Sequence, residues 1–307
     1  MQLLFEQALL PGATTVDPLT GEATTAPPYV KIHLYGSSTN GLSSRGSDVD
    51  LCLETNCGHV TVHTVAHILR TAQFTDVFTI AKAKVPICKF FDPATALAGD
   101  ININNLMALQ NTRLIRRYAD LDPRVRPFLF LVKAWAKARG LADAAKSGTI
   151  SSYGWCMIAL NFLQTRRPHR IIPSLHAIYL ERLARGEGVP VYIEGHDVAF
   201  ADDERVIADW HALMRSLAES ASLRGPTLAE LVVEFFHWMA HELPYERQVL
   251  SVRAGELIPK ADKGWGKHIS SLSRWLCVEE PFNPVRNLTN AVTFLSLLGL
   301  LSEVQRS

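Results

Sequence analysis

Two aspartates placed two residues apart, Asp48 and Asp50, could together bind a divalent cation. Apolar residues alternate with them up to Leu53, which is the pattern of a half-buried strand, and alternate residues of a strand share a face. Two neighbouring carboxylates repel each other and are costly to bury as a bare pair. A hard cation such as Mg²⁺, which takes oxygen ligands and often also holds a phosphate, would neutralise them. The pair therefore predicts metal-dependent chemistry on a phosphate-containing substrate.

The segment before this pair has the composition of a phosphate-binding turn. A short apolar strand at 31–35 ends at Gly36-Ser37, and Ser, Thr, Asn and Gly follow up to Ser47. Such residues turn the chain and leave backbone N–H groups free to hold phosphate oxygens. Strand, turn and aspartate strand together indicate a nucleoside triphosphate bound with its metal ions. The alternative is a polar hairpin whose aspartates face water.

A third carboxylate, Asp100, opens a second alternating stretch, Asp-Ile-Asn-Ile-Asn-Asn at 100–105. Asp100 and Asn102 share one face of the expected strand, and the isoleucines share the other. An aspartate on a neighbouring strand is what a two-metal site requires as its third acid. In isolation it would be an ordinary residue at the end of a strand.

Length and composition favour an ordinary globular protein of two domains. The chain has 307 residues, of which 48% are hydrophobic and 20% are charged. Its five cysteines are scattered and odd in number, which argues against a disulfide framework and for a reducing, intracellular compartment. No apolar run is as long as a membrane span, so no membrane partner is expected. The N-terminus lacks the basic residues of a signal peptide.

Positive charge is concentrated in one part of the chain. Residues 113–170 contain twelve Lys and Arg against three Asp, a net charge of +9 in a chain whose total is +1. This concentration indicates a local anionic ligand. The alternative is a set of solvated helix faces.

A coarse reading of periodicity divides the chain near residue 120. Strands are expected at 74–80 and 85–91, and a helix at 59–72 that carries His59, His63 and His67 on one face. The histidines lack a zinc-binding spacing, so exposure on a surface helix is the simpler interpretation, with a metal site as the alternative. Beyond the helix expected at 106–118 the pattern is mostly helical, with helices expected at 127–139, 148–164 and 228–243 and a short strand at 247–253.

The aspartate stretch resembles the signature of the DNA polymerase β-like nucleotidyltransferases, and later motifs resemble the terminal uridylyltransferases and noncanonical poly(A) polymerases within that superfamily. These motifs occur in the expected order: Asn111-Thr112, Lys133-x-Trp-Ala-Lys137, the Gly-Thr-x-Ser-Ser-Tyr-Gly stretch at 148–154, and Glu-Glu-Pro-Phe at 279–282. The compact layout is similar to that of the small uridylyltransferases of kinetoplastid mitochondria. That similarity would imply a mitochondrial location and RNA-binding accessory proteins; otherwise a cytoplasmic location is expected.

The resemblance implies an α+β fold: a nucleotidyltransferase catalytic domain with a mixed sheet at 29–120, and a mostly helical, PAP-associated domain at 121–307. Residues 1–28 are expected to pack with the helical domain, and the nucleotide to lie in a cleft between the two domains. The implied catalytic and metal-binding residues are Asp48, Asp50 and Asp100. The implied nucleotide-binding residues are Gly36, Ser37, Asn111, Thr112, Lys133, Lys137, Ser152, Tyr153, Glu280, Asn283 and Arg286.

Within that set, Tyr153 would stack on the base and Asn111 would bond the ribose hydroxyl. In the uridylyltransferases a second acidic residue follows the first in the base-recognition motif. Here Glu280 fills the first place, Asn283 replaces the second acid, and Arg286 lies at the discriminating position. Asn283 can still accept a hydrogen bond through its carbonyl.

The expected function is therefore RNA uridylyltransferase activity: addition of UMP from UTP to RNA 3′ ends by two-metal phosphoryl transfer with Mg²⁺ or Mn²⁺, as in RNA processing or RNA editing. The alternative is a poly(A) polymerase that uses ATP. Two other classes are a small-molecule nucleotidyltransferase, against which the basic segment argues, and an inactive RNA-binding scaffold, against which the three aspartates argue.

Overall fold

The structure is a computed structural model that describes residues 1–307 except 19, 59, 145–146, 167–169, 222–224 and 266–274. The chain forms two compact units, Met1–Arg116 and Arg117–Ser307. The boundary falls inside helix α4 (Leu106–Leu121), and each unit is described by itself.

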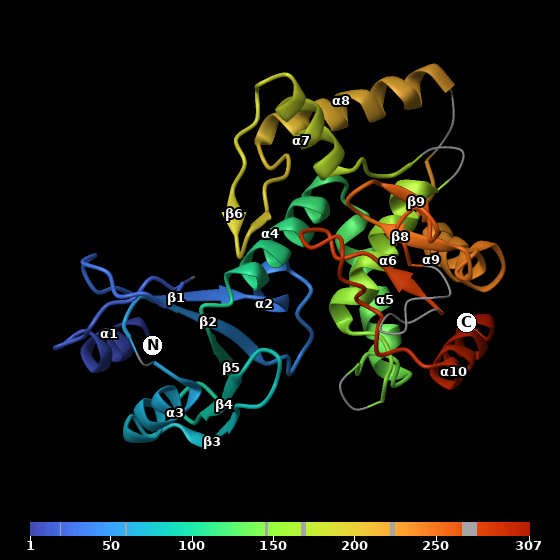
Figure 1. Ribbon diagram of the computed structural model, residues 1–307. Coiled ribbons are helices and arrows are strands. Elements are labelled where there is room, and N and C mark those ends of the chain that lie inside the picture. Colours follow the sequence, from blue (N-terminus) through green and yellow to red (C-terminus); the bar gives the residue numbers. More distant parts are fainter. Residues whose placement is uncertain (19, 59, 145–146, 167–169, 222–224, 266–274) are drawn as a thin grey trace. The chain divides into compact units, whose positions relative to one another are not determined.

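A five-stranded mixed sheet forms the centre of the first unit, with the strand order β1-β2-β5-β4-β3 (Figure 1). Only β2 and β5 run parallel; the other neighbours are antiparallel. The mixed sheet confirms the predicted α+β class. Its strands are β1 (Val30–Tyr35), β2 (Val49–Thr55), β3 (Thr75–Ile80), β4 (Ile87–Asp92) and β5 (Leu97–Ile103).

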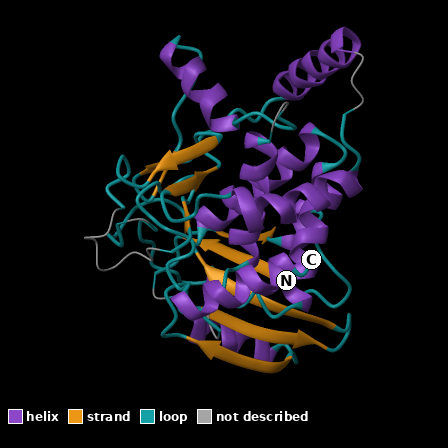
Figure 2. Ribbon diagram, turned by 90° about the vertical axis from the view of Figure 1, so that its right-hand side faces the viewer, coloured by secondary structure: helices purple, strands orange, loops and turns teal. Residues whose placement is uncertain are grey.

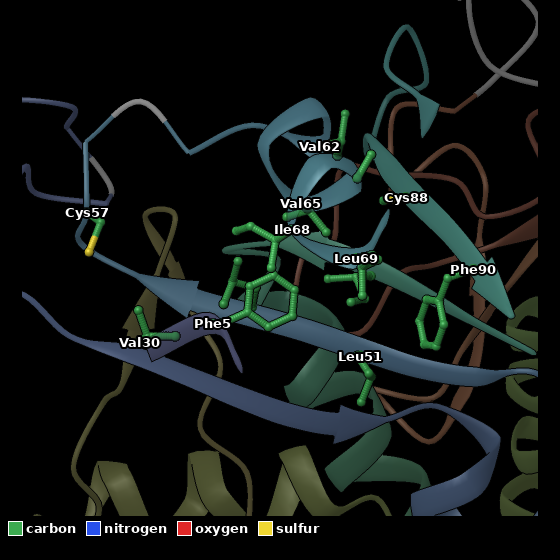
Figure 3. Close-up of a cluster of buried hydrophobic side chains, with 13 residues drawn as sticks. Phe5, Val30, Leu51, Cys57, Val62, Val65, Ile68, Leu69, Cys88 and Phe90 are labelled. Atoms are coloured by element: carbon green, nitrogen blue, oxygen red, sulfur yellow. The ribbon is translucent and has the colours of Figure 1, made fainter. Parts of the chain in front are cut away.

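Helix α3 (Val62–Thr71) covers one face of this sheet. Thr61 caps its first turn, so the helix begins after Thr61 and not at residue 59 as expected. Its apolar residues Val65 and Leu69 pack on Leu51 of β2 in a core cluster (Figure 3). Because alternate strand residues face opposite sides, this core leaves the aspartates of β2 and β5 on the other face.

The N-terminal segment packs on the sheet of the first unit, and not with the helical domain as expected. In α1 (Gln2–Leu9), Phe5 is fully buried in the same cluster as α3 and the strands. Gln2 donates to the Val30 carbonyl and accepts from the Ile32 amide, both at 2.7 Å. The physical reason is that β1 is an edge strand, and the glutamine side chain satisfies backbone groups there.

The second unit is mostly helical, as Figure 2 shows. Helix α6 is its centre, because every residue from Gly154 to Gln164 is buried, as the apolar composition of that segment predicted. Helices α5 and α6 pack together, and α9 packs on α5. The helices are α5 (Val125–Ala138), α6 (Ser152–Thr165), α7 (Leu175–Ala184), α8 (Glu204–Ala221), α9 (Leu228–His237) and α10 (Phe294–Gln305).

Strands also occur in the second unit, more than the one short strand expected at 247–253. Strand β8 (Gln248–Ser251) lies between β9 (Glu256–Pro259) and β10 (Cys277–Val278), and β6 (Tyr192–Ile193) forms a hairpin with β7 (His196–Asp197). The helix expected at 228–243 is α9 followed by a π-helical turn, η1 (Trp238–Glu242). The short strands other than β8 escaped prediction because two to four residues show no clear alternation.

All five cysteines are buried and free. Across the described parts of the chain, none of the helices combines the length and apolar character that crossing a bilayer requires.

Candidate active site

Four polar side chains lie in one row across the sheet of the first unit. In the strand register, Tyr35 of β1 is opposite Asp50 of β2, Asp50 is opposite Asp100 of β5, and Asp100 is opposite Lys89 of β4. Residues directly opposite each other point to the same side of a sheet. The structure therefore brings Asp50 and Asp100 together although fifty residues of sequence separate them.

Lys89 links Asp100 to Asp48, the remaining carboxylate of the predicted set. Its Nζ donates to both oxygens of Asp100 at 2.7 Å and lies 3.7 Å from Oδ2 of Asp48. The side chain of Asp48 is 50% exposed and that of Asp100 is 18% exposed. Lys89 was not among the predicted site residues, although it lies on the strand expected at 85–91. Its alternation with the buried Cys88 and Phe90 could have placed it on the aspartate face.

The turn at Gly36 lies directly against the carboxylate of Asp50. Gly36 has φ 71°, and a Cβ added there would lie 2.2 Å from Oδ2 of Asp50. The Gly36 amide donates to Oγ1 of Thr112 at 2.9 Å, and this hydroxyl in turn donates to the Ala108 carbonyl. Thr112 therefore holds the turn against α4, since its hydroxyl accepts from the Gly36 amide and donates to the Ala108 carbonyl.

The segment expected to be a loop at 38–47 begins with one turn of helix, α2 (Ser37–Asn40). The amides of Thr39 and Asn40 return to the Gly36 carbonyl, so they are not available to a phosphate. Ser37 is half-buried at the start of this turn, and Asn111 is half-buried beside Thr112 on α4.

Two asparagines of the 100–105 motif hold the aspartate strands in place. Asn102 is buried and donates to the hydroxyl of Tyr35 at 2.7 Å. Burial and then the nearby Asp50 charge raise the pKa of Tyr35, so its phenol stays protonated at neutral pH. Asn104 accepts from the Thr55 amide and donates to the Thr55 carbonyl, which joins the ends of β2 and β5. These asparagines explain why an amide-rich stretch follows Asp100.

Among the described residues, no three His, Cys, Asp or Glu side chains are arranged so that they could hold a metal ion. At the predicted site a cation, the Lys89 ammonium, is bound to Asp100 instead. The other candidate, the three histidines near α3, gains no support: His63 and His67 are exposed on that helix, and His59 lies outside the described residues.

In the second unit, the predicted triphosphate-binding residues lie on α5 and at the start of α6. Lys133 is half-buried and Lys137 is exposed, one turn apart on α5. Burial raises the pKa of Cys156 on α6 to about 12, and the nearby Lys133 ammonium opposes that rise, which places Lys133 beside α6. Ser152 is the first residue of α6, after the Ser151 cap, at a helix start whose first amides lack intrahelical acceptors.

The predicted base-recognition residues form one hydrogen-bonded loop. Tyr153 donates to Oε1 of Glu280 at 3.1 Å, and Oε2 of Glu280 accepts from the amides of Phe282 and Asn283. Glu280 is 1% exposed, and burial raises its pKa. Burial and then the Glu280 charge raise the pKa of Tyr153, so the phenol remains the donor. Glu280 therefore shapes the loop, because both of its oxygens are used within the chain.

Asn283 and Arg286 are the other two residues of this loop that are predicted to recognise the base. Oδ1 of Asn283 is buried with no hydrogen-bond partner among the described groups, and Arg286 is exposed. Lys263, which was not predicted, fastens the loop: its Nζ bonds the buried Glu279 and donates to the Pro284 carbonyl at 2.7 Å. An unpaired acceptor and a cation on the same loop are a set suited to recognising the edge of a base.

Much of the basic segment is neutralised within the chain. Arg117 pairs with Asp202 at 2.5 Å and Arg124 with Asp122 at 2.6 Å. Arg126, Arg139 and Arg166 also pair with carboxylates. The net charge of +9 counted over residues 113–170 is therefore partly neutralised in the fold, because several of these arginines pair with acids that lie outside that segment.

Comparison with known proteins places this geometry in a family. Residues 13–120 match the central palm domain described as poly(A) RNA polymerase, mitochondrial-like, and residues 227–286 match the domain described as Cid1 family poly A polymerase. The chain is 36% identical over 278 residues to poly(A) RNA polymerase cid11 of Schizosaccharomyces pombe, a match that covers 90% of this chain and 52% of cid11. This chain belongs to the family of terminal uridylyltransferases and noncanonical poly(A) polymerases.

Other members of the family show the same relationship. The chain is 32% identical over 270 residues to human poly(A) RNA polymerase GLD2, covering 83% of this chain and 51% of GLD2. It spans about half the length of the curated relatives it matches. A crystal structure of the Cid1 poly(U) polymerase is 25% identical, with a TM-score of 0.72 over 90% of this chain and 79% of that one. A solved structure of a cytoplasmic RNA terminal U-transferase shares the fold, with a TM-score of 0.74 and 24% identity. The match covers 99% of this chain and 82% of that one.

Proposed function

We propose that this chain transfers a nucleoside monophosphate from a ribonucleoside triphosphate to the 3′ hydroxyl of an RNA. The observation that carries the proposal is the placement of Asp50 and Asp100 opposite each other on the parallel strands β2 and β5, with Asp48 reached by the same lysine as Asp100. The names of the relatives support it, because cid11 and GLD2 are poly(A) RNA polymerases and Cid1 is a poly(U) polymerase. The predicted position of the nucleotide between the two domains stays a prediction.

The donor set fits a hard divalent cation, since all three acids offer carboxylate oxygens and one cation, the Lys89 ammonium, already binds two of them. Asp48, Asp50 and Asp100 would hold Mg²⁺, with Mn²⁺ as a substitute. When bound, the cation would lower the pKa of the attacking 3′ hydroxyl and offset charge on the phosphates. A solved structure of Cid1, 26% identical with a TM-score of 0.71, is described as bound to Mg 3′-dATP.

The chain's own residues would bind and orient the other reactants. Gly36 keeps the turn close to Asp50, and the Ser37 hydroxyl that follows it would bind the triphosphate. Lys133 and Lys137 would bind the triphosphate as two point charges on one helix face, and Ser152 would add a hydrogen bond at the start of α6. Asn111 would bond the ribose hydroxyl.

UTP remains the first candidate nucleotide and ATP the second. The buried acceptor of Asn283 and the Arg286 cation match the N3–H and O4 groups of uracil, and equally the N6 amine and N1 of adenine. The sequence relatives named poly(A) RNA polymerases specifically favour ATP as the alternative. Tyr153 would stack beneath either base.

A primer-extension assay tests this proposal directly. Each of the four ribonucleoside triphosphates is supplied singly with a labelled oligoribonucleotide, with MgCl₂ or with EDTA. We expect extension with UTP in MgCl₂ and none in EDTA, and faster extension with ATP would reject the preference for UTP.

Asp100→Ala serves as the matched variant. It should extend the primer at least 100-fold more slowly, because loss of one metal-binding acid removes charge stabilisation in the transition state. It should still bind the oligonucleotide, as measured by fluorescence anisotropy. Extension at the unmodified rate by Asp100→Ala would contradict the mechanism.

A further inference from the structure

Lys89 contacts the carboxylates of the aspartate row that would bind a metal ion. Its ammonium uses two of its hydrogens on the two oxygens of Asp100, each at 2.7 Å. The same nitrogen is 3.7 Å from Asp48, so one cation faces both acids. A divalent cation bound by these acids needs oxygens about 2.0–2.1 Å away and would occupy the same lone pairs.

The sheet register holds Lys89 in this place. Lys89 is directly opposite Asp100 in the antiparallel pairing of β4 with β5, and its neighbours Cys88 and Phe90 are buried on the other face. The backbone therefore cannot rotate the lysine away, whereas its long side chain can leave by changing rotamers. The Lys89 side chain is 30% exposed, which gives the ammonium access to solvent when it leaves.

We propose that Lys89 is a positioning residue that neutralises Asp100 while no metal is bound and is displaced when the divalent cation binds. This inference rests on the proposed metal-dependent function. In the absence of metal the ammonium limits the repulsion between Asp100 and Asp50, which lie opposite each other. Once displaced, it adds positive charge beside the acids, where an RNA phosphate would approach.

The proposal fixes the sign of one measurable effect. If Lys89 competes with the metal, Lys89→Met should bind Mn²⁺ roughly fivefold more tightly than the unmodified protein, the factor supplied by a well-aligned ion pair with partial exposure. If Lys89 merely braced the carboxylates, its loss would loosen them and weaken binding. Mn²⁺ binding is measured by electron paramagnetic resonance of the free ion, without nucleotide or RNA.

The matched control is Lys84→Met, which removes the same charge from an exposed position just before β4. It should bind Mn²⁺ as the unmodified protein does. Equal or weaker Mn²⁺ binding by Lys89→Met than by Lys84→Met would overturn the proposal.

A second measurement needs no variant. Amine-reactive labelling with site-resolved mass spectrometry should modify Lys89 several-fold faster in Mn²⁺ than in EDTA, while Lys84 reacts equally in both. An equal rate of Lys89 labelling in Mn²⁺ and in EDTA would overturn the proposal. A chain that passes both tests yet extends no RNA would contradict the proposed function and leave this inference intact.

Discussion

The carboxylate of Asp50 lies against the Cα of Gly36, so that a Cβ at position 36 would be 2.2 Å from Oδ2. Gly36 also has φ 71°, a conformation that residues with a side chain rarely adopt. The glycine is thus required twice, for the direction of the turn and for the position of the acid.

Gly36→Ala should displace Asp50 and lower the rate of nucleotide addition at least 100-fold. A displacement of a reacting group by about 1 Å can have an effect of that size. The rate is measured by single-turnover primer extension. The loss should be mainly in rate and not in RNA affinity.

Gly46→Ala is the control for backbone strain alone, because Gly46 has φ 78° and no atom within 4 Å of an added Cβ. It should lower the free energy of unfolding by about 1 kcal/mol and retain most activity. Similar activities for the two variants would show that the contact with Asp50 does not matter.

Lys263 should prove important for the loop that carries Asn283. Lys263→Met leaves the carboxylate of Glu279, which is 3% exposed, without its cation. Removal of one partner from a buried pair costs about 3 kcal/mol of unfolding free energy. Urea denaturation measures this loss, and the KM for the nucleotide should rise more than kcat falls.

The double variant Lys263→Met/Glu279→Gln tests the cause. Glutamine keeps the acceptor for Ser251 Oγ, which donates to Glu279 at 2.7 Å, and it removes the unpaired charge. Stability should therefore recover in part. A double variant less stable than Lys263→Met would show that charge burial is not the reason.

Asn283 should contribute to base selection through its unpaired Oδ1. Asn283→Leu keeps a similar size but removes the acceptor, and kcat/KM for the preferred nucleotide should fall about tenfold, the range of one hydrogen bond. The ratio of kcat/KM for UTP and ATP should move towards one. Val285→Ala, at a position 75% exposed on the same loop, should leave the ratio unchanged.

His176 on α7 should make the second unit sensitive to acid. It is fully buried against Phe282, and both ring nitrogens lack partners among the described groups. Burial, followed by the charge of Arg253, lowers its pKa from 6.5 to about 3. Between these values the unfolded chain holds one more proton, so stability falls as the pH falls.

From pH 7 to pH 5 this effect should cost about 2 kcal/mol of unfolding free energy. His176→Leu, which loses no hydrogen bond, should lose less stability over that range than the unmodified protein. Urea denaturation at both pH values measures the difference, and His67→Gln, at an exposed position, should behave as the unmodified protein. Parallel losses in His176→Leu and the unmodified protein would contradict the assignment.

Local patterns predicted much of the fold because they reflect local physics. The alternation around Asp50 predicted β2, and the pattern at 148–164 predicted the helix that the structure shows as α6. Partners distant in sequence were less accessible. Phe5 packs on the sheet of the first unit, contrary to expectation, because its burial depends on the packing of α1 against β1 and α3, which no short window encodes.

The sequence alone indicated the family, the mixed α+β class and three candidate acids, because residue types and their order along the chain carry those signals. Only the tertiary structure decided that Lys89 lies on Asp100, that Lys263 holds Glu279, and that Glu280 serves its own loop. Each of these contacts depends on strand register or on a turn that joins distant residues. Periodicity shows which face a side chain takes, whereas register decides which side chain lies opposite it.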